Sequence, residues 1–225
     1  FLSLESSSGG YQNVLVITDH FTRYAQAIPT RNQTARTTAE ALFNSFITHY
    51  GFPKRLHADQ GANFESRVIR ELCQIAGVDK SRTTAYHPMG NGMVERFNRS
   101  LLAMLGTLEP EKKTTWHKYV PAMVHAYNCT AHDSTGFSPY YLMFGRHPRL
   151  PVDMIFGLDR NDGSRNHTAY VDDLRQPLQG AYRRASEVAG RAQERQKARY
   201  DKPPRGAALE PGDRVLVRIL AFEGK

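Results

Sequence analysis

Two carboxylates, Asp59 and Glu95, occupy positions from which they could hold a divalent metal ion. Asp59 ends the short stretch RLHAD and precedes the glycine-containing loop QGANFES, and α/β sheets place ligands at such strand ends. Glu95 lies in the first turn of a helix predicted to begin after Gly92. Ions of the Mg²⁺ type take oxygen ligands from a few carboxylates and keep room for water and substrate phosphates. This donor set fits metal-assisted phosphoryl transfer, in which acids from separate elements converge on the ions.

Each acid also has a purely structural interpretation. An acidic residue in the first turn of a helix interacts favourably with the helix dipole, which is a sufficient reason for Glu95. An aspartate in a turn at a strand end, such as Asp59, is equally common. The metal interpretation requires the two side chains to meet, although thirty-five residues (60 to 94) lie between them.

The strands that would position these acids are visible as short apolar runs. NVLVIT (13–18) is typical of a buried strand, and RYAQAIP (23–29) is its expected hairpin partner across the turn DHFT. Further strands are expected at 55–59 and 82–86. Because helical patterns alternate with these strands, residues 1–150 are assigned to the α/β class, with a mixed sheet.

Apolar residues at helical spacing predict the helices. They recur at i, i+3, i+4 and i+7 from Ala39 to Tyr50, where Gly51 is the expected C-cap, and again over 69–76. In the helix after Gly92, Glu95, Asn98 and Arg99 are expected to face away from the apolar stripe. A further helix follows Thr115, and Pro121 is expected to kink it.

Charge and composition restrict the partners. The formal net charge of +8 favours a polyanionic partner, but it does not separate nucleic acid from an acidic membrane surface. The sequence has no apolar run long enough to span a bilayer. No membrane partner is expected. Cys73 and Cys129 lie in apolar helical patterns and are interpreted as buried thiols of a reducing compartment.

Four motifs in order resemble one family. HADQGANFES, YHPMGNGMVERFNRSL, WHKYVPAMVHAYN and TGFSPYYLMFGRHPRLP are similar to the integrase core of retroviruses and, more closely, of gypsy-type retrotransposons. The resemblance implies a ribonuclease H-like fold and a D…D-x35-E metal triad whose second and third members are Asp59 and Glu95. It also implies Mg²⁺ or Mn²⁺, double-stranded DNA of the element ends and of the target, a homo-oligomer and a nuclear location. The implied reactions are 3′-end processing of the DNA and strand transfer.

The resemblance divides the chain into three regions. Residues 1–155 correspond to the catalytic core, and 156–205 to a helical, Arg-rich extension and linker. KARYDK and EPGDRVLV resemble the stretch leading into the family's small C-terminal barrel, so 206–225 are expected to begin a truncated SH3-like domain. A DNA-binding role is implied for Tyr86, Asn91, Arg96, Asn98 and Arg99. Tyr86, Asn91 and Asn98 equally suit loop or surface positions.

The first member of the triad does not align with an acid in this chain. In the family it lies one strand earlier than VITDHFTRY, ahead of the turn that SSSGG represents here, and would immediately precede Phe1. Asp19 instead matches a hairpin-turn aspartate that stabilises its turn through an Asx-type bond. Asp19 remains the substitute third ligand. The chain is therefore expected to be a fragment with weak or no catalysis of its own.

Two other functions stay open. A domesticated or decayed integrase would bind DNA or chromatin without cutting it, and the unaligned first aspartate motivates this alternative. A nuclease of the ribonuclease H type would share the metal chemistry. The resemblance beyond Glu95 speaks against the nuclease, and cleavage of an RNA/DNA hybrid separates the two.

Overall fold

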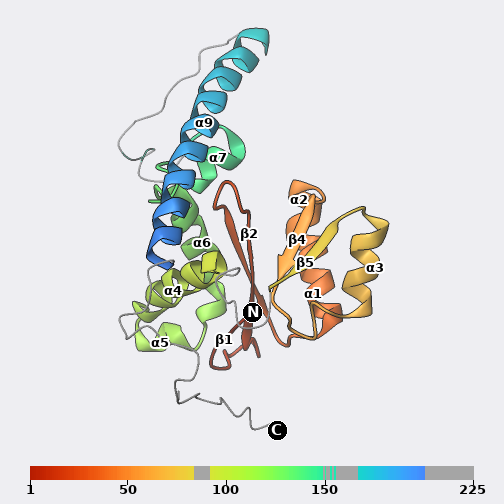
Figure 1. Cartoon of the computed structure of the whole chain (residues 1–225). Coiled ribbons are helices and arrows are strands. Elements are labelled where there is room, and N and C mark those ends of the chain that lie inside the picture. Colours follow the sequence, from red (N-terminus) through yellow and green to blue (C-terminus); the bar gives the residue numbers. More distant parts are fainter. Residues whose placement is uncertain (84–91, 149, 151–152, 154, 156–166, 201–225) are drawn as a thin grey trace, which may run out of the picture.

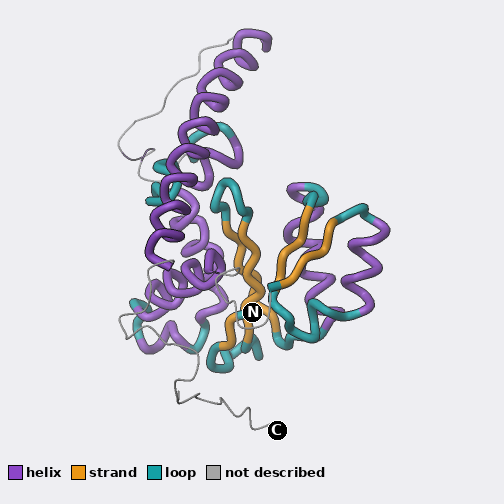
Figure 2. The backbone as a smooth tube through the Cα atoms, viewed as in Figure 1, coloured by secondary structure: helices purple, strands orange, loops and turns teal. Residues whose placement is uncertain are grey.

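The computed structural model describes residues 1–83, 92–148, 150, 153, 155 and 167–200. Strands lie between two groups of helices (Figures 1 and 2). The helices α1, α2 and α3 gather around β4 and β5, and the helices α4, α5, α6, α7 and α9 lie on the other side of β2. This arrangement of strands and helices is α/β, as expected.

The first sheet is antiparallel with the order β1-β2-β3. It contains β1 (Leu2–Ser3), β2 (Asn13–Thr18) and β3 (Ala25–Thr30). The predicted hairpin is confirmed, with Thr18 opposite Ala25 and Val14 opposite Pro29. The short β1 was not predicted, and it pairs Leu2 with Val14. Residues 14–16 of β2 are buried, in agreement with their unbroken apolar run.

The second sheet is a parallel pair, β4 (Arg55–Ala58) and β5 (Asp79–Arg82). The predicted strand at 82–86 is wrong in its bounds, because pairing begins at Asp79 and the strand ends at Arg82. Thr83 extends the contact by donating its N–H to the Ala58 carbonyl at 3.0 Å, and 84–91 lie outside the described residues. The described strands thus form two sheets, whereas a single mixed sheet was expected.

Helices cover one face of this parallel pair. α1 (Ala35–Leu42) continues through a π-helical turn (Phe43–Ile47) into α2 (Thr48–Tyr50), which ends at Gly51 as predicted. Gly51 has φ 81°, a conformation that glycine adopts without strain. The connection from β4 to β5 runs through α3 (Arg67–Ile75), whose N-cap is Ser66. Leu42, Phe46 and Ile47 form one buried cluster in this layer, and Ile69 and Cys73 of α3 are buried as well.

The larger core lies between the first sheet and the other helices. It joins α4 (Gly92–Gly106) and α6 (Val120–Cys129) to β2, with α5 (Pro110–Lys113) and a 3₁₀ turn (Trp116–Lys118) between the helices. Its buried members are Val14, Val16, Ala25, Phe97, Leu101, Leu105, Trp116, Val120 and Val124. The predicted kink is wrong, because α6 begins at Val120 and Pro121 occupies its first turn, where a missing N–H costs nothing.

The last described elements are α7 (Pro139–Phe144) and the long α9 (His167–Tyr200). Ala181 and Ala185 of α9 pack on Leu142 of α7. The Tyr182 hydroxyl donates to the Leu142 carbonyl at 2.9 Å. The helix expected in the Arg-rich extension is therefore present. The assignment of 206–225 to a second domain stays a prediction, since those residues lie outside the described ranges.

Candidate metal and phosphate site

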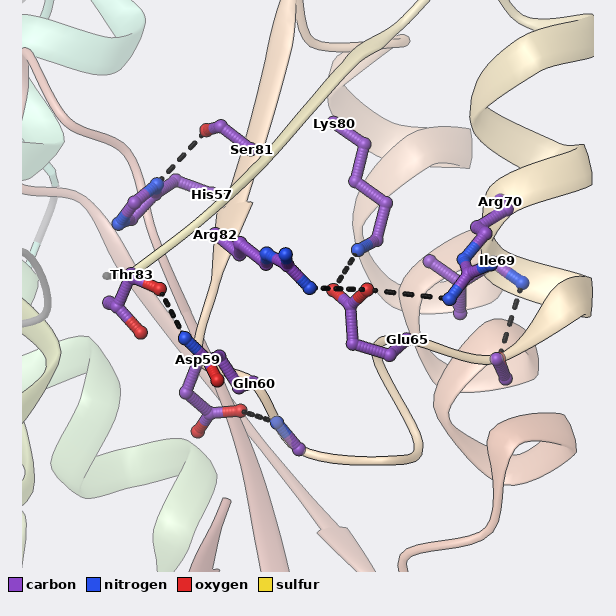
Figure 3. Close-up of polar contacts among 12 residues, drawn as sticks. His57, Asp59, Gln60, Glu65, Ile69, Arg70, Lys80, Ser81, Arg82 and Thr83 are labelled. Carbon is purple, nitrogen blue, oxygen red and sulfur yellow. Dashed lines mark hydrogen bonds and ion pairs between the residues drawn. The ribbon is translucent and has the colours of Figure 1, made fainter. Parts of the chain in front are cut away.

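Asp59 directly follows β4, and its carboxylate is held by its own loop. Its Oδ1 accepts the backbone N–H of Gly61 at 2.9 Å (Figure 3). A Cβ atom on Gly61 would lie 2.8 Å from this Oδ1 and 2.7 Å from Oδ1 of Asn63. Both oxygens end flexible side chains, so a side chain at position 61 would displace the Asp59 carboxylate or the Asn63 amide from its present place.

Polar contacts tie the loop after Asp59 to β5 (Figure 3). Gln60 donates its Nε2 to the Thr83 carbonyl at 2.9 Å. At the far end of the loop, the Glu65 carboxylate pairs with Lys80, and both side chains are mostly buried, at 19% and 15% exposure. Two arginines approach the same carboxylate, Arg70 at 3.6 Å and Arg82 at 3.8 Å. The Lys80 ammonium holds the pKa of Glu65 below its usual value. The loop that carries Asp59 is thus fixed at both ends.

A cavity of about 390 Å³ lies beside Asp59, between the two sheets. β2 and β4 each contribute four of its twenty lining residues, and Met93 and Val94 contribute from the first turn of α4. Glu95 is the next residue along α4 and is exposed. The structure therefore brings the end of β4 and the start of α4 to one cavity. The joint coordination of a metal ion by Asp59 and Glu95 stays a prediction.

Asp19 also borders this cavity, but it is engaged in the hairpin turn. Its Oδ2 accepts the Thr22 N–H at 2.7 Å, the Thr22 hydroxyl at 2.8 Å and the Phe21 N–H at 3.2 Å. These are the Asx-type bonds expected from its position in DHFT. One of its two carboxylate oxygens is thus committed to the turn, and its role as a third metal ligand stays a prediction.

The basic residues predicted on α4 are accessible. Arg96 and Arg99 are exposed. Asn98 differs from the expectation, because it is half-buried rather than on the open face, and its Oδ1 is buried without a hydrogen-bond partner among the described residues. Its position three residues before the buried core residue Leu101 explains this burial, because i and i+3 share one face of a helix. Tyr86 and Asn91 lie outside the described residues.

Sequence reasoning missed Arg23, which joins the hairpin turn to α4 and to the loop after α6. Its guanidinium donates to the His20 carbonyl at 2.6 Å and to Ser134 Oγ at 3.2 Å. It also contacts Met93 Sδ at 3.1 Å. Burial, followed by the nearby Arg96, lowers the pKa of Arg23. An arginine in a turn carries no signal in the sequence, so only the fold identifies it.

The donor set suits a hard divalent cation. Asp59 and Glu95 offer carboxylate oxygens, and Mg²⁺ is commonly held by one or two carboxylates plus water and substrate phosphates. No cluster of three or more His, Cys, Asp or Glu side chains that could hold a metal occurs within the described ranges.

The thiols do not add to this donor set. Cys73 is buried, as expected, but Cys129 is only partly buried, since the end of α6 is more open than its apolar pattern indicates. Burial raises the pKa of both thiols. Among the helices that the structure describes, none is long and apolar enough to cross a bilayer.

Comparisons with known proteins agree with this architecture. Residues 2–88 match the Integrase core domain family. The chain is 30% identical over 223 residues to the retrovirus-related Pol polyprotein from transposon 412 of Drosophila melanogaster, covering 96% of this chain and 17% of the polyprotein. It is also 30% identical over 224 residues to the Gag-Pol polyprotein of avian reticuloendotheliosis virus, covering 99% of this chain and 19% of that protein. The chain thus spans less than a fifth of these curated relatives.

A solved structure shares the fold. It is the simian T-cell lymphotropic virus intasome in complex with the PP2A regulatory subunit B56 gamma. The TM-score is 0.50 at 20% sequence identity, and the match covers 65% of this chain and 52% of that chain.

Proposed function

The chain contains a retroviral-type integrase catalytic core, and from this premise we propose that it acts in inserting retroelement DNA into target DNA. The proposed reactions are trimming of a DNA 3′ end by water and transfer of the freed 3′-hydroxyl to a target phosphodiester. The observation that supports this proposal is the cavity bordered by Asp59 and by the turn of α4 that precedes Glu95.

Asp59 and Glu95 would together hold Mg²⁺ or Mn²⁺ in this proposal. The bound ions would supply stabilisation of the attacking and leaving oxygens at phosphorus. The Gly61 N–H holds the Asp59 carboxylate through its hydrogen bond, and Gln60 ties the same loop to the Thr83 carbonyl. A preorganised carboxylate lowers the reorganisation needed when the substrate arrives. The exposed Arg96 and Arg99 would contact phosphates next to the metal ions.

The partners follow from the chemistry. Double-stranded DNA is the proposed substrate, and the net charge of +8 supports a polyanionic partner. Because insertion joins two element ends to one target, we propose that a homo-oligomer acts, in the nucleus. The 30% identity to a transposon Pol polyprotein supports a retroelement origin, and the gypsy type is part of the proposal.

Metal binding tests this function without requiring turnover. Mn²⁺ is titrated into the protein and the free ion is followed by electron paramagnetic resonance. Asp59→Asn and Glu95→Gln should each weaken Mn²⁺ binding at least tenfold. Asp79→Asn is the matched control, because Asp79 is an exposed acid at the start of β5. Equal Mn²⁺ affinity in all four proteins would refute the metal site.

Activity assays then separate integration from its alternatives. The integrase containing this chain is given a labelled DNA end, a target duplex and Mn²⁺. Strand-transfer products that disappear in Asp59→Asn support the proposal. DNA binding with no transfer in the unmodified protein would favour a domesticated, non-cutting role. Cleavage of an RNA/DNA hybrid in place of transfer would favour the nuclease.

A further inference from the structure

Arg23 has a backbone conformation that its residue type disfavours. Its φ is 67°, and it is the one non-glycine residue with positive φ in the described ranges. Glycine adopts this left-handed region freely, whereas a long side chain there costs energy. The turn itself requires the conformation, since the Arg23 N–H donates to the Asp19 carbonyl at 3.1 Å. A strained arginine where glycine would be relaxed points to a function of the side chain.

The Arg23 guanidinium is half-buried and bonds to neutral groups. Its partners are the His20 carbonyl, Ser134 Oγ and Met93 Sδ, which come from the hairpin turn, the loop after α6 and α4. Within the part of the chain that the structure describes, Arg23 forms no ion pair with a carboxylate. Its position is therefore fixed, while its charge is not neutralised by a direct contact.

A second arginine stands close by. Arg96 lies one turn of α4 beyond Met93, which the Arg23 guanidinium contacts at 3.1 Å, so the two arginines share one side of the helix start. Burial and the nearby charge of Arg96 lower the pKa of Arg23. The other titratable groups near the pair include Tyr127, His132, Asp19 and Asp133, and Glu95 directly precedes Arg96 on α4. Asp19 already accepts three hydrogen bonds within its turn. Two adjacent guanidinium groups that bond to no carboxylate among the described residues form a binding site for an external anion.

This anion-binding site of Arg23 and Arg96 adjoins the cavity that borders Asp59. His20 and Met93, both contacted by Arg23, line that cavity. We propose that Arg23 and Arg96 bind one phosphodiester group of the DNA substrate at the mouth of this cavity. The inference rests on the proposed function, and it adds Arg23 as a residue that positions the DNA strand beside the metal site.

A second basic cluster provides a contrast. Arg70, Lys80 and Arg82 also converge, but they do so around the Glu65 carboxylate (Figure 3). Their charge is partly neutralised inside the protein, so the arrangement is complete without a ligand. Among the residues that the structure describes, neither Arg23 nor Arg96 forms an ion pair with a carboxylate.

Salt-dependent DNA binding tests the proposal. Binding of a fluorescent 20-base-pair duplex is measured by anisotropy from 50 to 200 mM salt for the unmodified protein, Arg23→Gln, Arg96→Gln and the double variant. Each lost phosphate contact lowers the slope of log affinity against log salt by about 0.9. Arg23→Gln should show this decrease and weaken binding several-fold. Because both arginines hold one phosphate, the double variant should lose less than the sum of the two single losses.

Arg36→Gln is the matched control, with the same loss of charge at an exposed arginine paired with Glu40. Thermal unfolding of each variant is followed in parallel, because Arg23→Gln also removes hydrogen bonds. Arg23→Lys should keep the salt slope, since it keeps the charge. If Arg23→Gln unfolds at a lower temperature but has the salt slope of Arg36→Gln, Arg23 only stabilises the fold and the proposal is overturned.

The DNA-binding test of Arg23 and the Mn²⁺-binding test of Asp59 can be distinguished by their results. Asp59→Asn should lose Mn²⁺ affinity while it keeps the slope of DNA binding. Intact Mn²⁺ binding in Asp59→Asn, with a reduced salt slope of DNA binding in Arg23→Gln, would refute the metal site and support the phosphate-binding site. If the unmodified protein binds the duplex with no salt dependence, the proposed phosphate-binding site is overturned.

Discussion

The backbone N–H of Gly61 donates to Oδ1 of Asp59 at 2.9 Å, and the Gly61 Cα faces the same oxygen. A Cβ atom at this position would come within 2.8 Å of Asp59 Oδ1. The carboxylate and the glycine two residues later therefore form one unit, in which the missing side chain allows the hydrogen bond. This unit sets the orientation of the acid at the end of β4.

Gly61→Ala should weaken Mn²⁺ binding without unfolding the protein. The added methyl group must displace the Asp59 carboxylate or the Asn63 amide, because both oxygens lie under 3.0 Å from it. We expect a loss of about tenfold in Mn²⁺ affinity, comparable to the loss of a group that orients a metal ligand. Calorimetric titration measures it. Gly106→Ala is the control, because a Cβ there meets nothing within 4 Å.

Glu65→Gln should change how stability depends on pH. The Lys80 ammonium lowers the pKa of Glu65, so the ionised carboxylate is favoured in the folded state. The ionised Glu65 carboxylate stabilises the folded state fully above the unfolded-state pKa of about 4.5. This stabilisation is lost as the pH falls through the lower, folded-state pKa. The free energy of unfolding of the unmodified protein should therefore fall more steeply below pH 4.5 than that of Glu65→Gln. Urea unfolding at pH 7, 5, 4 and 3 tests this, and parallel curves would contradict it.

Asn128→Ala should destabilise the fold by about 2 to 4 kcal/mol, because it leaves two buried backbone groups unpaired. The Asn128 side chain is 2% exposed, accepts the Ala25 N–H at 2.9 Å and donates to the Ala25 carbonyl at 2.9 Å. It thereby completes the outer edge of β3 from α6. Thermal unfolding provides the measurement. Thr130→Ala removes only an exposed hydrogen bond to the Ala126 carbonyl, so it should change stability by less than about 1 kcal/mol.

The sequence predicted the elements that follow local rules. The amphipathic run from Ala39 to Tyr50 gave a helix ending at Gly51, and the apolar run of 13–18 gave β2. β5 was misplaced because DKSR is polar, whereas RTTAY contains β-branched and aromatic residues. The position of β5 is determined by its pairing with β4 and by the Glu65–Lys80 contact, and neither can be predicted from the local sequence. Pro121 was misjudged for a similar reason, since the start of α6 depends on the preceding 3₁₀ turn.

The candidate site was predictable in part. The position of Asp59 after a strand and that of Glu95 in a first helical turn follow from the pattern of elements. The hydrogen bonds of Asp19 also follow from turn chemistry. Gly61 and Arg23 required the fold, because one acts through the absence of a side chain and the other through contacts to three separate segments.

The central claim is that Asp59 and Glu95 bind the same divalent ions. Anomalous diffraction from crystals grown with Mn²⁺ and a short DNA duplex tests it most directly. We predict an anomalous peak with carboxylate oxygens of both residues about 2.0 to 2.3 Å away, close to the distances that Mg²⁺ takes. A Mn²⁺ peak that contacts only one of the two acids, or carboxylates of residues 59 and 95 that face different sides of the protein, would contradict the claim.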